Sequence, residues 1–115
     1  LKHTIILSET FKKTIIMKIL NNNPWIKFKD LDETIRNNLD YQGFMQEKKF
    51  KINRIRDIIS NEYLDIKKNK KSNLEVFKTK IEELVILKLS IEPSELTDKI
   101  IETSISKKWY KLYKS

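Results

Sequence analysis

Apolar residues recur at three- and four-residue intervals along most of the chain, and this spacing constrains the fold more than any other feature. Leu31, Ile35 and Leu39 are four residues apart, and similar intervals run through residues 8–20 and 46–66. Such intervals place apolar side chains on one face of an α-helix, because the helix turns once every 3.6 residues. The 115 residues include only one glycine and two prolines, so the turn residues that hairpins need are scarce. We predict an all-α fold.

The clearest helix start lies at Asp30. Glu33 follows three residues later, which completes a capping-box pattern for a helix that carries the Leu31 stripe. Phe28 just before this helix and Tyr41 just after it are expected to close the same core from its two ends. The segment 42–45 contains the only glycine of the chain, and we predict a 3₁₀ turn there.

The pattern divides the chain into two helical units. Residues 4–68 contain three predicted helices with one shared core, and residues 74–115 begin a second unit. Residues 69–73 between them are basic and polar without an apolar side chain, which is typical of a solvated linker. Leu1 is not a methionine, so we expect the chain to be a piece of a longer protein.

The net charge of +8 favours acidic partners, such as a nucleic-acid backbone, a phosphopeptide or an anionic protein surface. The heavy use of lysine, isoleucine and asparagine also fits an AT-rich genome, so the charge alone does not choose among these partners. No long uncharged apolar run is present, which argues against a membrane-spanning segment.

Several kinds of catalytic and metal chemistry are excluded by residue types that are absent or rare. There is no cysteine, so disulfides and thiolate metal sites are excluded, and His3 is the only histidine. A histidine pair for a metal and a Ser-His-carboxylate set are therefore not available. One glycine cannot build a glycine-rich phosphate loop. We expect no catalytic site, no metal and no cofactor.

The first unit resembles an FF domain, a small helical module of splicing and transcription factors. Phe11 stands at the phenylalanine of the family's first helix, and Phe28 stands where a tryptophan usually precedes the second helix. Leu31 and Ile35 follow Phe28 by three and seven residues, as the family's hydrophobic positions do. At residues 40–41 this chain has Asp-Tyr in place of the family's Arg-Tyr pair. The resemblance covers about residues 8–66.

The sequence departs from the family pattern at three positions. Trp25 lies three residues before the expected tryptophan position, Asp40 replaces an arginine, and Ile55 takes the place of the second signature phenylalanine. The resemblance implies a helix–helix–3₁₀–helix bundle. We expect its core to contain the following residues: Phe11, Ile15, Phe28, Leu31, Ile35, Tyr41 and Ile55.

The second unit resembles a partial repeat of the first. Phe77 corresponds to Phe11, and Leu96 and Ile101 fall near the places of Leu31 and Ile35. The pattern would require a third helix beyond the last residue given.

The resemblance implies a non-enzymatic interaction module in a nuclear scaffold for pre-mRNA splicing or transcription. Its partners would be spliceosomal or transcription proteins, among them the C-terminal tail of RNA polymerase II, bound through short acidic or phosphorylated segments. The candidate contacts are the basic side chains outside the predicted stripes: Lys12, Lys13, Lys27, Lys29, Lys48, Lys51 and Arg54.

A small helical nucleic-acid-binding protein is the alternative. In this reading residues 46–66 form the second helix of a helix-turn-helix-like pair. Aromatic and basic residues also alternate within 25–29 and 109–114, an arrangement that can stack bases and neutralise phosphates. The same aromatic residues can instead be core or capping residues with lysines directed to water, and the sequence leaves both interpretations open.

Overall fold

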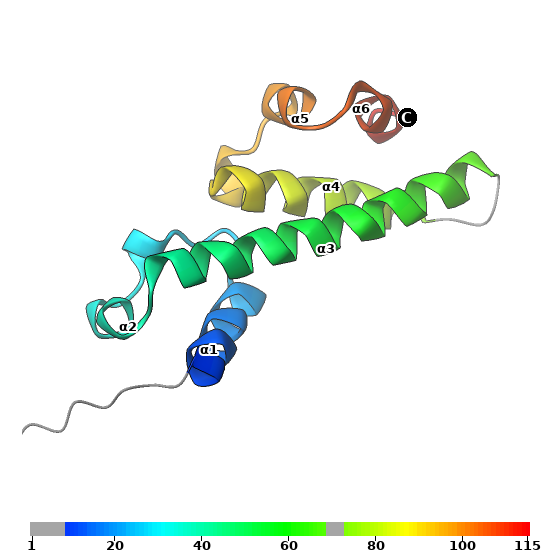
Figure 1. Cartoon of the computed structure of the whole chain (residues 1–115). Helices are drawn as coiled ribbons and strands as arrows, with labels where there is room; N and C mark the ends of the chain where they lie inside the picture. Colours follow the sequence, from blue (N-terminus) through cyan, green and yellow to red (C-terminus); the bar gives the residue numbers. More distant parts are fainter. Residues whose placement is uncertain (1–8, 69–72) are drawn as a thin grey trace, which may run out of the picture.

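The structure, a computed structural model, describes residues 9–68 and 73–115, and its regular elements are all helical (Figure 1). The predicted all-α class is confirmed. The elements follow one another in this order: α1 (Glu9–Asn22), η1 (Phe28–Asp30), α2 (Glu33–Asn38), α3 (Tyr41–Lys67), α4 (Leu74–Leu89), η2 (Pro93–Glu95), α5 (Asp98–Ser104) and α6 (Lys107–Tyr113). Most of the predicted linker, residues 69–72, lies outside the described residues. Among those described, no helix is both long enough and apolar enough to cross a membrane.

The same order of elements occurs twice. A longer helix is followed by a 3₁₀ turn, a short helix and another helix, first in α1–α3 and again in α4–α6. The two 3₁₀ turns close with equivalent hydrogen bonds, since the Leu31 amide donates to the Phe28 carbonyl at 3.1 Å and the Leu96 amide donates to the Pro93 carbonyl at 3.2 Å. The predicted correspondence of Leu96 with Leu31 therefore extends to the backbone.

Equivalent capping residues also start the helices of the two halves. Asp32 caps α2 and Thr97 caps α5, each directly after the leucine that ends the 3₁₀ turn. Asp40 then caps α3, and Ser106 caps α6. Each of these side-chain oxygens accepts a hydrogen bond from an amide of the first turn that has no partner within the helix. Short polar side chains thus set the start of four helices.

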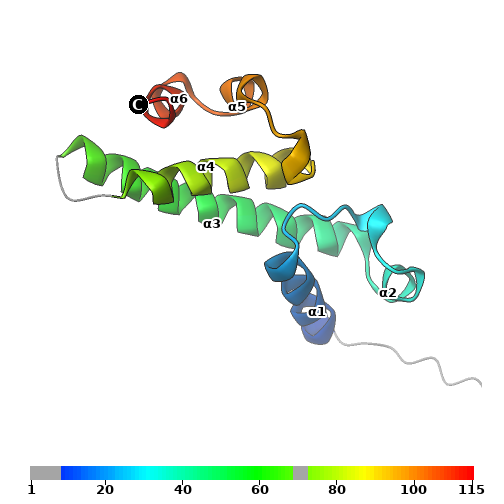
Figure 2. The same ribbon diagram turned by 180° about the vertical axis from the view of Figure 1, so that it is seen from behind.

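Two separate hydrophobic cores result, and α3 contributes to both. The first core joins α1, the α2 region and the start of α3, with Ile16, Leu20 and Phe44 among its buried members. The second core joins the later part of α3 to α4, α5 and α6, and Ile55 and Ile59 are the buried α3 residues in it. Figures 1 and 2 both show α4 lying along α3, with α5 and α6 on the other side of α4.

The predicted helix start at Asp30 and the predicted position of the 3₁₀ turn are wrong. Asp30 ends the 3₁₀ turn η1, which lies before the second helix and not after it. The carboxylate of Asp32 accepts from the Thr34 amide at 2.9 Å, so α2 begins two residues later than expected. Residues 42–45 form the first turn of α3, because the Asp40 carboxylate accepts from the Gly43 amide at 3.0 Å and starts that helix.

The predicted core is confirmed at Leu31 and contradicted at Phe11, Ile35 and Tyr41. Leu31 is buried, and Phe28 and Ile15 are partly buried against the first core. Ile16 and Leu20 form the buried face of α1, and Phe11 lies on an exposed part of the same helix.

Ile35 and Tyr41 are also exposed. Ile35 is in the middle of the short helix α2, while Leu31 and Leu39 at its two ends reach the core. The Tyr41 ring meets the Phe28 ring edge to face at 5.3 Å, outside the buried cluster. Ile55 is buried as predicted, but it belongs to the second core and not to the first.

Candidate functional site

Four of the seven predicted contact residues line two adjoining depressions beside α1 and α3. Lys12 and Lys13 lie on α1, and Lys51 and Arg54 lie on α3. The two depressions have volumes of about 160 Å³ and about 140 Å³. Both depressions are lined by Glu47 and Phe50, so together they form one surface, which we call the α1–α3 groove.

The floor of the α1–α3 groove is apolar and open to solvent. Met17 of α1 and Phe50 and Ile58 of α3 line it, and all three are exposed, Phe50 to 48%. The ammonium group of Lys13 lies over the Phe50 ring, 5.9 Å from its centroid. Large apolar side chains gathered around a hollow are typical of interaction surfaces, whereas scattered ones are ordinary.

Most of the charge around the groove is neutralised within the protein. The Lys13 ammonium lies 3.5 Å from the Glu47 carboxylate, and the Lys80 ammonium of α4 lies 3.3 Å from the Glu83 carboxylate. Lys12 pairs in the same way with Glu9, at 3.7 Å. These cations therefore offer little net charge to a ligand.

Lys51 and Arg54 are the exceptions. The Lys51 ammonium donates to the side-chain oxygen of Asn21 at 3.1 Å, and an amide leaves the charge uncompensated. Arg54 is exposed, and within residues 9–68 and 73–115 its guanidinium forms no ion pair. Two uncompensated positive charges therefore lie beside Met17, Phe50 and Ile58.

Lys48, another predicted contact residue, is buried and does not line the groove. It is only 2% exposed, and its ammonium donates to the Ile26 carbonyl at 2.9 Å and to the Ser90 hydroxyl at 2.7 Å. Burial and the neighbouring charge of Lys27 lower the pKa of Lys48 from 10.5 to about 8. Lys48 is therefore a structural residue between α3, the loop after α1 and the end of α4.

Lys27 and Lys29 lie outside the α1–α3 groove. Lys27 immediately precedes η1 and is partly buried, and Lys29 lies within η1 and is exposed. The Lys29 carbonyl accepts a hydrogen bond from the Arg36 guanidinium at 3.0 Å. Neither side chain lines the two depressions.

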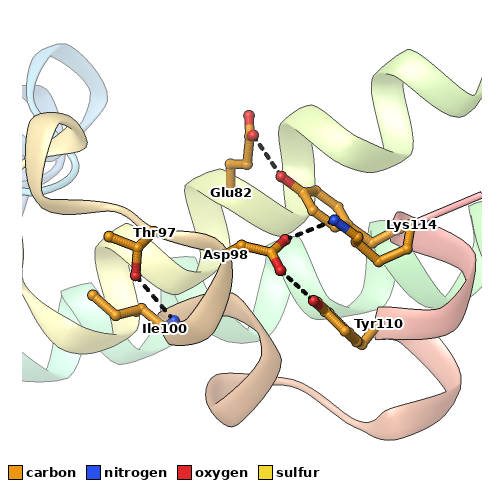
Figure 3. A network of polar contacts seen from close by, with 7 residues as sticks. Glu82, Thr97, Asp98, Ile100, Tyr110 and Lys114 are labelled. Carbon is orange, nitrogen blue, oxygen red and sulfur yellow. Dashed lines mark hydrogen bonds and ion pairs between the residues drawn. The ribbon is translucent and has the colours of Figure 1, made fainter.

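The aromatic residues near the end of the chain pack on the second core. Trp109, Tyr110 and Tyr113 are partly buried against it. The Tyr110 hydroxyl donates to the Asp98 carboxylate, to which Lys114 also donates at 3.2 Å (Figure 3). The hydrogen bond from Tyr110 is the largest cause that holds the pKa of Asp98 below its usual range, and the hydrogen bond from Lys114 is the second largest. These rings act as core and bridging residues, which leaves them poorly placed to stack on bases.

Sequence reasoning missed the apolar part of the groove. Phe50, Arg54 and Ile58 are four residues apart and form one outward ridge of α3. This spacing could have identified them as a second stripe, but only the structure brings Met17 of α1 beside the ridge. As for metal sites, the described residues contain no group of three or more aspartate, glutamate or histidine side chains that could hold an ion.

The comparisons with known proteins do not assign the chain to a family. No family model matches it, and neither the curated proteins nor the solved structures gave a significant match.

Proposed function

We propose that the α1–α3 groove binds a short acidic peptide segment that also carries apolar side chains, and that the protein is a non-enzymatic interaction module. One observation carries the proposal: Lys51 and Arg54, which have no acidic partner among the described residues, lie beside an exposed apolar floor. A carboxylate on the peptide would compensate these charges, and an apolar side chain two or three residues away would cover Phe50.

The arrangement favours modest affinity with selection by charge. Arg54 can bind a carboxylate through two parallel hydrogen bonds, whereas Lys51 acts as a point charge. Both are near the solvent, so salt should weaken their attraction, and the shallow depressions bury little apolar area. We therefore expect dissociation constants of about 10 to 100 µM for a single peptide.

The resemblance to FF domains extends this proposal to a nuclear scaffold of splicing or transcription. The partners would then be spliceosomal or transcription proteins, including the C-terminal tail of RNA polymerase II. The 3₁₀ turn lies before the second helix here, and the resemblance implies one after it. The groove supports peptide binding independently of the resemblance.

A selection from random peptides tests the proposal without assuming a partner. Phage-displayed peptides of about twelve residues would be selected on the wild-type protein, and the enriched sequences measured by calorimetry. We expect the winners to combine Asp or Glu with Phe, Leu or Met. Their binding should fall at least about tenfold in a Lys51→Glu/Arg54→Glu variant. Lys49→Glu, on an exposed α3 residue that does not line the groove, is the charge-reversal control for position.

Three results would contradict the proposal. The first is enrichment of basic or neutral peptides. The second is equal binding by the double variant and by Lys49→Glu. The third is a preference for duplex DNA or RNA over every selected peptide, with a steep loss on adding salt, which would identify a nucleic-acid-binding protein instead.

A further inference from the structure

A second hollow, of about 400 Å³, lies where α3 and α4 meet the junction between α5 and α6. It is large enough for a small organic ligand. Its lining includes Arg56 of α3, Lys88 of α4 and, around the α5–α6 junction, Ser104, Ser106 and Trp109. We call it the junction pocket.

The junction pocket is separate from the α1–α3 groove. Arg56 follows Arg54 by two residues, and two residues turn an α-helix by about 200°. Arg54 and Phe50 line the groove, while Arg56 and Ile52 line the junction pocket, so the two sites use opposite faces of α3.

The polar part of the junction pocket is suited to an anion. No aspartate or glutamate is among its lining residues. Arg56 is exposed and forms no ion pair with any other described residue. The Lys88 ammonium donates to the Ser104 carbonyl at 3.0 Å, an uncharged acceptor. Two cations thus face the pocket without a compensating charge.

The lining also includes two serines, Ser104 and Ser106. The Ser106 hydroxyl oxygen accepts from the Trp109 amide at 3.2 Å, so its hydrogen remains free to donate. Ser104 is a further lining residue. Two cations with adjacent hydroxyls match the three terminal oxygens of a phosphate better than the two oxygens of a carboxylate.

The remaining wall is apolar. Ile52, Leu84 and the partly buried Trp109 are among the residues that line it. A free inorganic phosphate would leave this wall in contact with water. A ligand with an aromatic body would cover the wall and gain from ring contact with Trp109.

We propose that the junction pocket binds a phosphate monoester carried on an aromatic body, with the phosphate on Arg56 and Lys88 and the body against Trp109. The same chemistry occurs in mononucleotides and in phosphotyrosine, so both sources are tested. The inference does not depend on peptide binding in the α1–α3 groove.

The test uses the whole chain and measures binding by amide chemical shifts and Trp fluorescence. The probes are AMP, phosphotyrosine and phenyl phosphate, and the controls are phenol and inorganic phosphate. We expect at least one of the aromatic phosphates to bind about tenfold more tightly than either control. Comparing AMP with phosphotyrosine then identifies the source.

Two arginine variants on the same helix provide the matched comparison. Arg56→Gln should weaken binding of the aromatic phosphate about tenfold or more, while Arg54→Gln should change it less than about twofold. Peptide binding in the groove should show the reverse pattern. Both side chains are exposed, so both variants should fold, which circular dichroism checks.

The proposal is overturned if no aromatic phosphate binds more tightly than phenol or inorganic phosphate. It is also overturned if Arg54→Gln weakens binding as much as Arg56→Gln does. If no peptide is selected at the groove but the aromatic phosphate still binds and its binding depends on Arg56, the proposed function is rejected. This inference then remains valid.

Discussion

The ammonium nitrogen of Lys48 lies 2.7 Å from the hydroxyl oxygen of Ser90, although 42 residues separate them in the chain. Ser90 caps the end of α4 in the left-handed conformation, with a φ of 52°. Lys48 also donates to the Ile26 carbonyl, so one buried side chain connects α3 to the loop after α1 and to the end of α4. Residues near both cores meet at this point.

The pKa of Lys48 predicts a specific dependence of stability on pH. A lysine with a pKa of about 8 in the folded state and 10.5 when unfolded releases its proton earlier when folded. Between these values the unfolded chain binds more protons, so the free energy of unfolding should rise with pH, by up to about 3 kcal/mol. Urea unfolding between about pH 7 and pH 9.5 should record about 2 kcal/mol of this rise.

Lys48→Met is the control for that titration, since it removes the ionisable group and should remove most of the slope. Burial and the hydrogen bond to Glu82 raise the pKa of Tyr113 to about 12. This shift has the opposite sign, because its contribution is lost as pH rises above about 10. The urea unfolding series therefore stops below about pH 10, where Tyr113 begins to contribute. An equal slope in wild type and Lys48→Met would contradict the assignment.

Substitutions at Ser90 separate the hydroxyl from the backbone conformation. Both Ser90→Ala and Ser90→Gly remove the acceptor for Lys48, but only glycine adopts a positive φ without steric cost. We expect Ser90→Ala to be less stable than Ser90→Gly by about 1 kcal/mol in urea unfolding. Equal stabilities would argue against the left-handed conformation at this residue.

Adjacent isoleucines on α3 should respond very differently to truncation. Ile59 is fully buried in the second core, whereas Ile58 is 38% exposed and lines the α1–α3 groove. Ile59→Ala should lower the free energy of unfolding by about 3 kcal/mol, and Ile58→Ala by less than about 1 kcal/mol. Ile58→Ala should instead weaken binding of the selected peptides. A reversed order of stabilities would contradict the helix orientation.

The equivalent capping residues of the two halves should contribute equally to the free energy of unfolding. Asp32→Ala and Thr97→Ala each leave a first-turn amide without its partner, and each should cost about 1 kcal/mol. Thermal unfolding measures both, with Asn53→Ala on an exposed part of α3 as the control. A loss at only one of the two caps would show that the two halves are not energetically equivalent.

The sequence predicted helix content and several helix bounds well, because spacing and capping are local properties. A second helical unit was expected to begin at residue 74, and helix α4 does begin at Leu74. Helix α1 was also located correctly, but the predicted burial of Phe11 was wrong. Apolar residues occur on more than one side of it, and only packing against α3 selects Ile16 and Leu20.

Long-range contacts explain the remaining errors. A lysine within a helix is normally an exposed residue, and the burial of Lys48 depends on partners 22 and 42 residues away. The candidate cations Lys12, Lys13, Lys51 and Arg54 were identified as basic side chains outside the predicted apolar stripes. Their gathering on one surface follows from the packing of α1 against α3, which no short motif encodes.

The double use of α3 bears on how this chain can be divided. At 27 residues the helix is about 40 Å long, and it supplies Phe44 to one core and Ile59 to the other. Severing the chain between α3 and α4 would leave one fragment with a bare apolar helix face and the other without the surface on which it folds. Excised pieces should therefore aggregate or stay unstructured, even though the two halves follow the same plan.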